Sequence, residues 1–431
     1  MWRTLNGDLG LMPTAIVHLS SVAGGPLLDS SGGRLGQIQD VVARLDSGDQ
    51  LPPPVIGLKA RIGGREMFVP IDRIAEFGPD SARTSTTKLN LAQFESRPGE
   101  VLLRRDLLDH SVINVATAGL VSAREVELVE KDGSWLVAGI DPSFRPRFWR
   151  LFPRRFRGHD NEHAQFVPWH EMEPFVGQAK GSRLRFASRR LARLHPAQIA
   201  DLVEAASHDE GEEIIAAVGH DKELEADVFE ELDDEHQVEF LQDRSDEQVA
   251  AVLARMASDD AADLLLELDQ RRRLPVLNLL PAGKQRKIRS LLAHNPSTAG
   301  GLMNPDFIAV GGDATVADAL GLVRASELGG QLLATVCLID SAGVLIGTVA
   351  LPELVRADPG AHLTTLLDAQ TPTVSAETDL PEVAQLMTDF NLVAMPVLDA
   401  DGHPVGMIGV DDVLERLLPE EWRRRTGAAR H

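Results

Sequence analysis

The chain has 431 residues, with 43 Lys or Arg and 65 Asp or Glu, which gives a formal net charge of −22 at pH 7. This length predicts three or more domains, and the acidic balance argues against a general nucleic-acid-binding protein. The single cysteine, Cys337, lies in an apolar segment, so an intrachain disulfide framework is excluded. No apolar run approaches the roughly 18–20 residues that cross a bilayer, and the N-terminus does not resemble a secretion signal. We therefore expect a cytoplasmic protein.

The first 180 residues are rich in strand patterns. Residues 33–45 alternate as a half-buried strand does, and a later strand ends in Val69-Pro70-Ile71-Asp72. A looser second copy ends in Val167-Pro168-Trp169-His170. This pattern resembles the PRC-barrel, a small β-barrel that serves mostly as an interaction module. We expect one PRC-like barrel at residues 14–95 and a second at residues 96–180.

Residues 144–157 break the acidic trend, because they interleave six arginines with aromatic residues. Aromatic rings suit a lipid headgroup region and arginines attract anionic lipid, so peripheral binding to an anionic membrane surface is one interpretation. A barrel insertion that packs its own aromatics is another, and nucleic-acid binding is a third.

An acidic helical region follows. Residues 201–270 contain 24 Asp or Glu, and their only basic residues are Lys222, Arg244 and Arg255. Within them an acidic start followed by an apolar stripe recurs about every 12 residues, at Asp234, Asp246 and Asp259. Acidic residues favour helix N-termini, so the pattern predicts short stacked helices. We expect an α-helical superhelix over residues 188–300.

Residues 303–418 contain one pattern twice. Asp340, Gly343, Gly347 and Glu353 lie 59 positions before their equivalents, which are Asp399, Gly402, Gly406 and Asp412. Each copy predicts a strand, a glycine turn, a second strand and a helix, and two such units bury their apolar faces against each other. The repeat resembles a tandem pair of CBS domains, which are ligand-sensing modules. We expect CBS repeats at residues 301–360 and 361–420, a basic tail at 421–431, and a homodimer formed through the CBS domains.

The order of the modules adds a second resemblance. Short acidic helices, then Ala299-Gly300-Gly301-Leu302-Met303-Asn304-Pro305, then a CBS pair resemble the cytoplasmic portion of MgtE-type magnesium channels over residues 188–418. That family's membrane domain should follow the CBS pair, yet the chain ends at His431. The expectation is therefore a regulatory protein that is not itself a channel.

The resemblance implies Mg²⁺ ions that hold the helical domain and the CBS pair together through facing carboxylates. A hard divalent cation with oxygen ligands neutralises carboxylates that would otherwise repel one another. The family's ligand positions correspond here to Asp259, Asp263, the main-chain carbonyl of Gly301, Asp379, Asp412 and Glu415. Other family carboxylates are replaced, by Pro381, Asn391, Arg423 and Arg424. Asp259 and Asp263 also fit a helix-capping role, and the two roles are compatible.

A nucleotide site is the alternative cofactor. Nucleotide-binding CBS motifs place Ser or Thr three residues before an Asp, whereas here Ala350 precedes Glu353 and Gly409 precedes Asp412. The hydroxyl is absent from both, which leaves only a ribose contact through Asp412.

The sequence thus predicts a multidomain α+β protein with N-terminal β-barrels, an α-helical superhelix and a tandem CBS pair. We expect a cytoplasmic Mg²⁺-responsive regulator without catalytic activity that acts through a protein partner, a membrane protein of ion homeostasis. The alternatives are a constitutive interaction scaffold and an adenine-nucleotide sensor.

Overall fold

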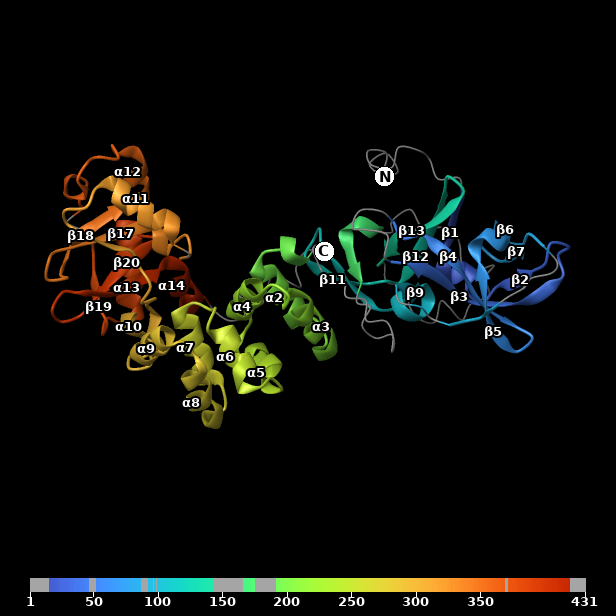
Figure 1. Cartoon of the computed structure of the whole chain (residues 1–431), viewed down its shortest axis with the longest axis horizontal. Helices are drawn as coiled ribbons and strands as arrows, with labels where there is room; N and C mark the ends of the chain where they lie inside the picture. The colour runs from blue at the N-terminus through green and yellow to red at the C-terminus, as the bar shows by residue number, and fades with distance from the viewer. Residues whose placement is uncertain are drawn as a thin grey trace. The chain divides into compact units, whose positions relative to one another are not determined.

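The computed structural model describes residues 15–45, 52–86, 92–95, 97, 99–142, 166–174, 191–326, 328–368 and 371–418. The arginine- and aromatic-rich segment 144–157, Arg423, Arg424 and the basic tail 421–431 lie outside these residues. The chain divides into two compact units, residues 1–220 and residues 221–431 (Figure 1). No helix in the part of the chain that the structure describes has the length and apolar character of a membrane span.

The first unit contains a mixed sheet, in which all strand pairs but one are antiparallel. Its strands run in the order β6-β7-β2-β3-β4-β5-β8, with β9 beside β3. Their bounds are β2 (Pro26–Leu28), β3 (Arg34–Arg44), β4 (Val55–Ile62), β5 (Arg65–Pro70), β6 (Ile74–Phe77), β7 (Ala82–Thr84), β8 (Ala92–Gln93) and β9 (Glu100–Leu102). The β4–β5 hairpin turns through Gly63 and Gly64, at φ 58° and 82°, where a side chain would be strained.

Two smaller sheets complete the β-structure of this unit. One has the order β1-β12-β13-β14 and the other β11-β10-β15. The strands are β1 (Ala15–His18), β10 (Ser111–Asn114), β11 (Gly119–Ser122), β12 (Glu125–Lys131), β13 (Ser134–Asp141), β14 (Val167–Pro168) and β15 (Met172–Pro174). Helices α1 (Leu19–Val22), α2 (Pro196–Ala205) and α3 (His208–Val218) also belong to the first unit.

Strand pairing joins the two predicted barrels, whose boundary was expected between residues 95 and 96. The first strand, β1, pairs with β12, whereas β9 pairs with β3. Buried residues from both halves, such as Leu58, Val69, Leu128 and Met172, form one hydrophobic cluster. The two halves therefore share a core, and their description as two PRC-like barrels stays a prediction.

The two Val-Pro segments have the same local geometry. Pro70 of β5 faces Gly57 of β4, and Pro168 of β14 faces Gly139 of β13. Each proline is followed by one turn of 3₁₀ helix, Ile71–Arg73 and Trp169–Glu171. The repeated sequence pattern thus corresponds to a repeated strand-to-turn junction.

Glycine is required at this junction. A Cβ atom at Gly139 would lie 2.2 Å from the carbonyl oxygen of Val167 and 2.6 Å from the ring of Phe166. Because neither the strand nor the packed ring can move away freely, we expect Gly139→Ala to destabilise the first unit by about 2 kcal/mol in urea denaturation. Gly119→Ala is the matched control, since its Cβ would approach nothing closer than 3.5 Å. Equal stability of the two variants would contradict this account.

The second unit begins with a superhelical array of helices. They are α4 (Lys222–Glu231), α5 (Asp234–Gln242), α6 (Asp246–Leu253), α7 (Ser258–Glu267), α8 (Gln270–Leu279) and α9 (Ala282–Leu291). Each helix packs on the one two places along, so α4 contacts α6, α5 contacts α7, α6 contacts α8 and α7 contacts α9. Side chains cap the helices: Asp221 accepts from the main-chain N–H of Glu223, and Asp233 from that of His236. The predicted helical superhelix is confirmed.

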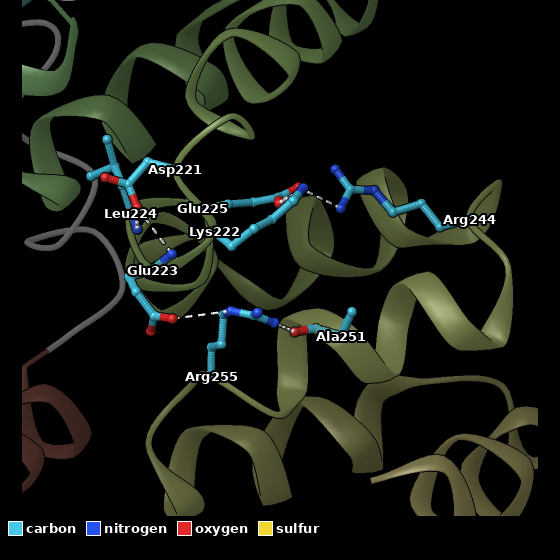
Figure 2. Close-up of polar contacts among 8 residues, drawn as sticks. All are labelled: Asp221, Lys222, Glu223, Leu224, Glu225, Arg244, Ala251 and Arg255. Carbon is cyan, nitrogen blue, oxygen red and sulfur yellow. Dashed lines mark hydrogen bonds and ion pairs between the residues drawn. The ribbon is translucent and has the colours of Figure 1, made fainter.

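The three basic residues of the acidic tract are all engaged with acidic partners (Figure 2). Lys222 and Arg244 share the buried carboxylate of Glu225, at 2.7 and 2.8 Å. Arg255 pairs with Glu223 at 3.0 Å and donates to the carbonyl of Ala251 at 2.9 Å. These three basic side chains therefore form ion pairs within the helical array.

A pair of equivalent sheets follows. The first repeat contains β16 (Ala309–Gly311), α11 (Val316–Ala325), β17 (Thr335–Ile339), β18 (Leu345–Ala350) and α12 (Leu351–Arg356), after the short helix α10 (Ala299–Leu302). The second contains β19 (Val374–Ser375), α13 (Leu380–Phe390), β20 (Ala394–Leu398), β21 (Pro404–Gly409) and α14 (Val410–Leu417). In each, a parallel pair is extended by an antiparallel strand.

The register of the two sheets repeats at the predicted spacing. Leu338 faces Gly347 in the first sheet, and Val397 faces Gly406 in the second, with a bulge immediately after each. Gly343 and Gly402 turn the two hairpins at φ 87° and 84°. The predicted CBS pair is confirmed. Cys337 is buried in its core, and burial raises the pKa of this thiol to about 12.

Candidate divalent-cation site

Carboxylates from three helices gather where the helical array of the second unit meets the CBS pair. Glu230 lies in α4, Asp259 and Asp260 in the first turn of α7, and Asp412 in the first turn of α14. We call these four residues the carboxylate cluster.

The clustered side chains perturb one another electrostatically. Burial raises the pKa of Asp412 to about 8, with Asp259, Asp411 and Glu415 as further causes. Burial also raises the pKa of Glu230 to about 7 and that of Asp259 to about 6. Asp412 and Glu230 therefore retain protons near neutral pH, which a cation with oxygen ligands could replace.

Asp260 has the most acidic surroundings. Burial raises the pKa of Asp260 well above its usual range, and four carboxylates add to the effect: Asp259, Glu230, Asp412 and Glu415. Asp260 thus connects the α4 side of the carboxylate cluster to the α14 side.

The segment between α10 and β16 positions Asp259. The Asn304 side-chain amide donates to Asp259 Oδ1 at 3.0 Å, and Asn304 exchanges main-chain hydrogen bonds of 2.8 and 2.9 Å with Met407 of β21. Ser258 donates to Asp306 at 3.2 Å, and Lys287 pairs with the same carboxylate. Asp259 also accepts from main-chain N–H groups of its own helical turn. The N-cap of α7 is Ala257, so Asp259 lies within the first turn and not at the cap.

The other sequence-predicted ligands are distributed differently. Asp263 is ion-paired with Arg416 of α14, and Glu415 acts on Asp260, Asp263 and Asp412. Burial raises the pKa of Asp263, while Arg416 opposes that shift. Asp263 and Glu415 therefore lie at the margin of the carboxylate cluster.

Asp379 and Gly301 lie in a different part of the second unit, beside Thr298. Asp379 is exposed at the N-terminal end of α13, where its backbone bridges to Thr298. Gly301 lies in α10 and donates its N–H to the carbonyl of Thr298 at 3.0 Å. The structure thus brings Asp259, Asp412 and Glu415 together, and it places Asp379 with Gly301 around Thr298.

A cavity of about 850 Å³ adjoins the carboxylate cluster. Its wall combines acidic residues from α4 and α7, Asn304, residues 306–309 and 328–332, and the start of α14. Seven carboxylates and two cations line it: Asp227, Glu230, Asp259, Asp260, Asp306, Asp411 and Asp412, with Arg255 and Lys284.

The carboxylate oxygens are not closely assembled. Among the residues that the structure describes, none of these carboxylates belongs to a set of three ligand atoms within 4.8 Å of one another. Binding of a cation by several of them therefore requires their oxygen atoms to move closer together.

Two sequence families match the chain. Residues 194–297 match the MgtE intracellular N domain, and residues 366–419 match the CBS domain. The chain therefore carries an MgtE N domain followed by CBS repeats. The carboxylate cluster lies between elements of these two parts.

The chain is also similar to curated magnesium transporters. The magnesium transporter MgtE of Thermus thermophilus is 32% identical over 143 residues, which are 33% of this chain and 32% of that protein. The magnesium transporter MgtE of Bacillus subtilis is 23% identical over 166 residues, 38% of this chain and 37% of that protein. The chain spans about a third of the length of the curated relatives it matches.

Solved structures are similar as well. A crystal structure of the cytosolic domain of the Mg²⁺ channel MgtE in complex with ATP is 27% identical, covers 52% of this chain and 92% of that one, and has a TM-score of 0.49. A crystal structure of the soluble part of a magnesium transporter is 24% identical, covers 53% and 89%, and has the same TM-score.

Proposed function

We propose that the protein is a Mg²⁺-responsive regulatory module without catalytic activity, whose helical array and CBS pair draw together when the cation binds. The observation that supports this proposal is the carboxylate cluster, in which Asp259 and Asp260 of α7 are electrostatically linked to Asp412 of α14. Burying several carboxylates close together is unfavourable, and a divalent cation relieves that cost.

This module acts through a protein partner. The curated relatives are magnesium transporters of which this chain matches about a third, so we propose a membrane protein of ion homeostasis as the partner. We also propose a homodimer formed through the CBS pair. Large apolar side chains of its second repeat are exposed: Phe390, Val393, Leu414 and Leu417.

Hydrogen exchange with and without millimolar Mg²⁺ tests this function. We expect slower exchange in α7 and α14 of the full chain when Mg²⁺ is present, because the carboxylates that hold these helices apart become bridged. Asp259→Asn should abolish the effect. Glu353→Gln is the matched control, since Glu353 is the repeat equivalent of Asp412 but is exposed on α12. Superimposable exchange profiles with and without Mg²⁺ would reject the proposal, and the scaffold interpretation would then stand.

Adenine-nucleotide sensing is the second candidate, and the cavity beside Asp412 is the observation that favours it. Seven carboxylates line the cavity and would repel phosphate groups, and Gly409 offers no hydroxyl. We therefore expect ATP in EDTA to give little thermal stabilisation, and ATP with Mg²⁺ to give more. A ligand at 100 times its Kd stabilises by about 2.7 kcal/mol, so thermal unfolding detects even modest affinity. Equal stabilisation in EDTA and in Mg²⁺ would contradict this prediction.

A further inference from the structure

One lysine lies among the residues of the carboxylate cluster. Lys284, in the first turn of α9, is partly buried and donates from Nζ to the carbonyl oxygen of Met256. Its positive charge counteracts the pKa increases of Asp259 and Glu230. In return, those carboxylates and Asp306 counteract the effect of burial, which lowers the pKa of Lys284.

The neighbouring basic side chains form ion pairs with other acidic residues. Arg255, the other cation in the cavity wall, pairs with Glu223 on the helical array. Lys287 pairs with Asp306, and Arg416 pairs with Asp263. Among the described residues that line the cavity, Lys284 is therefore the cation whose charge acts on Asp259 and Glu230.

We propose that Lys284 is a resident counter-ion of the carboxylate cluster, which stabilises the cation-free state and competes with the divalent cation. A lysine ammonium is a compact point charge on a flexible stem, so it can neutralise carboxylates without forming fixed bidentate pairs. Here the Met256 carbonyl holds it in place. The Lys284 ammonium repels a divalent cation that enters the carboxylate cluster. This repulsion raises the cation concentration needed for half-saturation. The divalent part of this inference rests on the proposed function.

Calorimetric Mg²⁺ titration of the full chain tests the competition. Lys284→Met keeps most of the apolar stem and removes the charge, so we expect the affinity for Mg²⁺ to increase about tenfold, the order of magnitude for removing one unit charge beside a divalent cation. Lys284→Arg keeps the charge and should stay close to wild type. Arg286→Met is the matched control on the same helix. The Arg286 side chain is exposed and makes no hydrogen bond or ion pair with the described residues, so the Mg²⁺ affinity of this variant should change less than about twofold.

Thermal unfolding in EDTA tests the counter-ion role without any divalent cation. We expect Lys284→Met to lower the Tm, and Asp259→Asn to recover much of the loss in the double variant, because one carboxylate fewer needs one counter-ion fewer. Additive effects of the two substitutions, together with an unchanged Mg²⁺ affinity in Lys284→Met, would overturn the inference. If wild type binds no Mg²⁺ while the two substitutions remain coupled, the counter-ion role holds and the proposed function fails.

Discussion

Raising the pH from 5 to 8 in the absence of divalent cations is expected to destabilise the second unit by at least about 3 kcal/mol. The pKa values of Asp259, Glu230 and Asp412 are raised in the folded protein to about 6, 7 and 8. The folded state therefore binds more protons than the unfolded state does across this range. Their contribution to stability is fully present below the unfolded pKa near 4 and is lost as the pH rises through the folded values.

Far-UV circular dichroism of urea unfolding at pH 5, 6.5 and 8 in EDTA measures this dependence. Asp40 of the first unit contributes in the same direction, since burial raises its pKa to about 6. Asp412→Asn isolates the carboxylate cluster, because it removes the group with the pKa of about 8 and leaves Asp40 in place. We expect the variant to lose less stability than wild type between pH 6.5 and 8. Identical pH profiles of the two proteins would contradict the electrostatic account.

Replacing Glu225 with alanine is expected to cost about 3 kcal/mol of unfolding free energy. Glu225 is 5% exposed and accepts from both Lys222 and Arg244. The Arg244 guanidinium also lies 5.0 Å from the ring centroid of Phe229, so the substitution leaves a largely buried cation without its carboxylate.

Glu223→Ala is the control for this substitution. The Glu223 side chain is 73% exposed and pairs with Arg255, so its loss should cost less than about 1 kcal/mol. Urea denaturation of both variants gives the comparison. A cost for Glu225→Ala no larger than that for Glu223→Ala would show that the buried pair does not stabilise the helical array.

The parts of the fold that the sequence predicted are those set by local pattern. The CBS repeat could be predicted because Gly343 and Gly402 are needed at positive φ, and because the flanking strands keep the same spacing. The helical array could be predicted because its acidic residues lie at helix starts. The pairing of β1 with β12 could not be predicted, since it joins residues more than 100 positions apart.

The candidate site was only partly predictable for the same reason. The spacing of Asp259 and Asp263 places them on one helix face. In the folded chain, however, Asp263 forms an ion pair with Arg416, whereas Asp259 accepts a hydrogen bond from Asn304. Asp260 and Glu230 were not predicted, because nothing in their local pattern shows that α4 and α14 approach the first turn of α7. The assignment of individual metal ligands stays a prediction.

Calorimetric titration of EDTA-treated wild type with Mg²⁺ tests the central claim most directly. The account predicts saturable binding near neutral pH with release of protons, because Asp412 and Glu230 retain protons that the cation displaces. The observed enthalpy should therefore depend on the ionisation enthalpy of the buffer. Combined Asp259→Asn and Asp412→Asn substitutions should abolish this binding. Absence of binding to wild type, or unchanged binding to the double variant, would contradict the account.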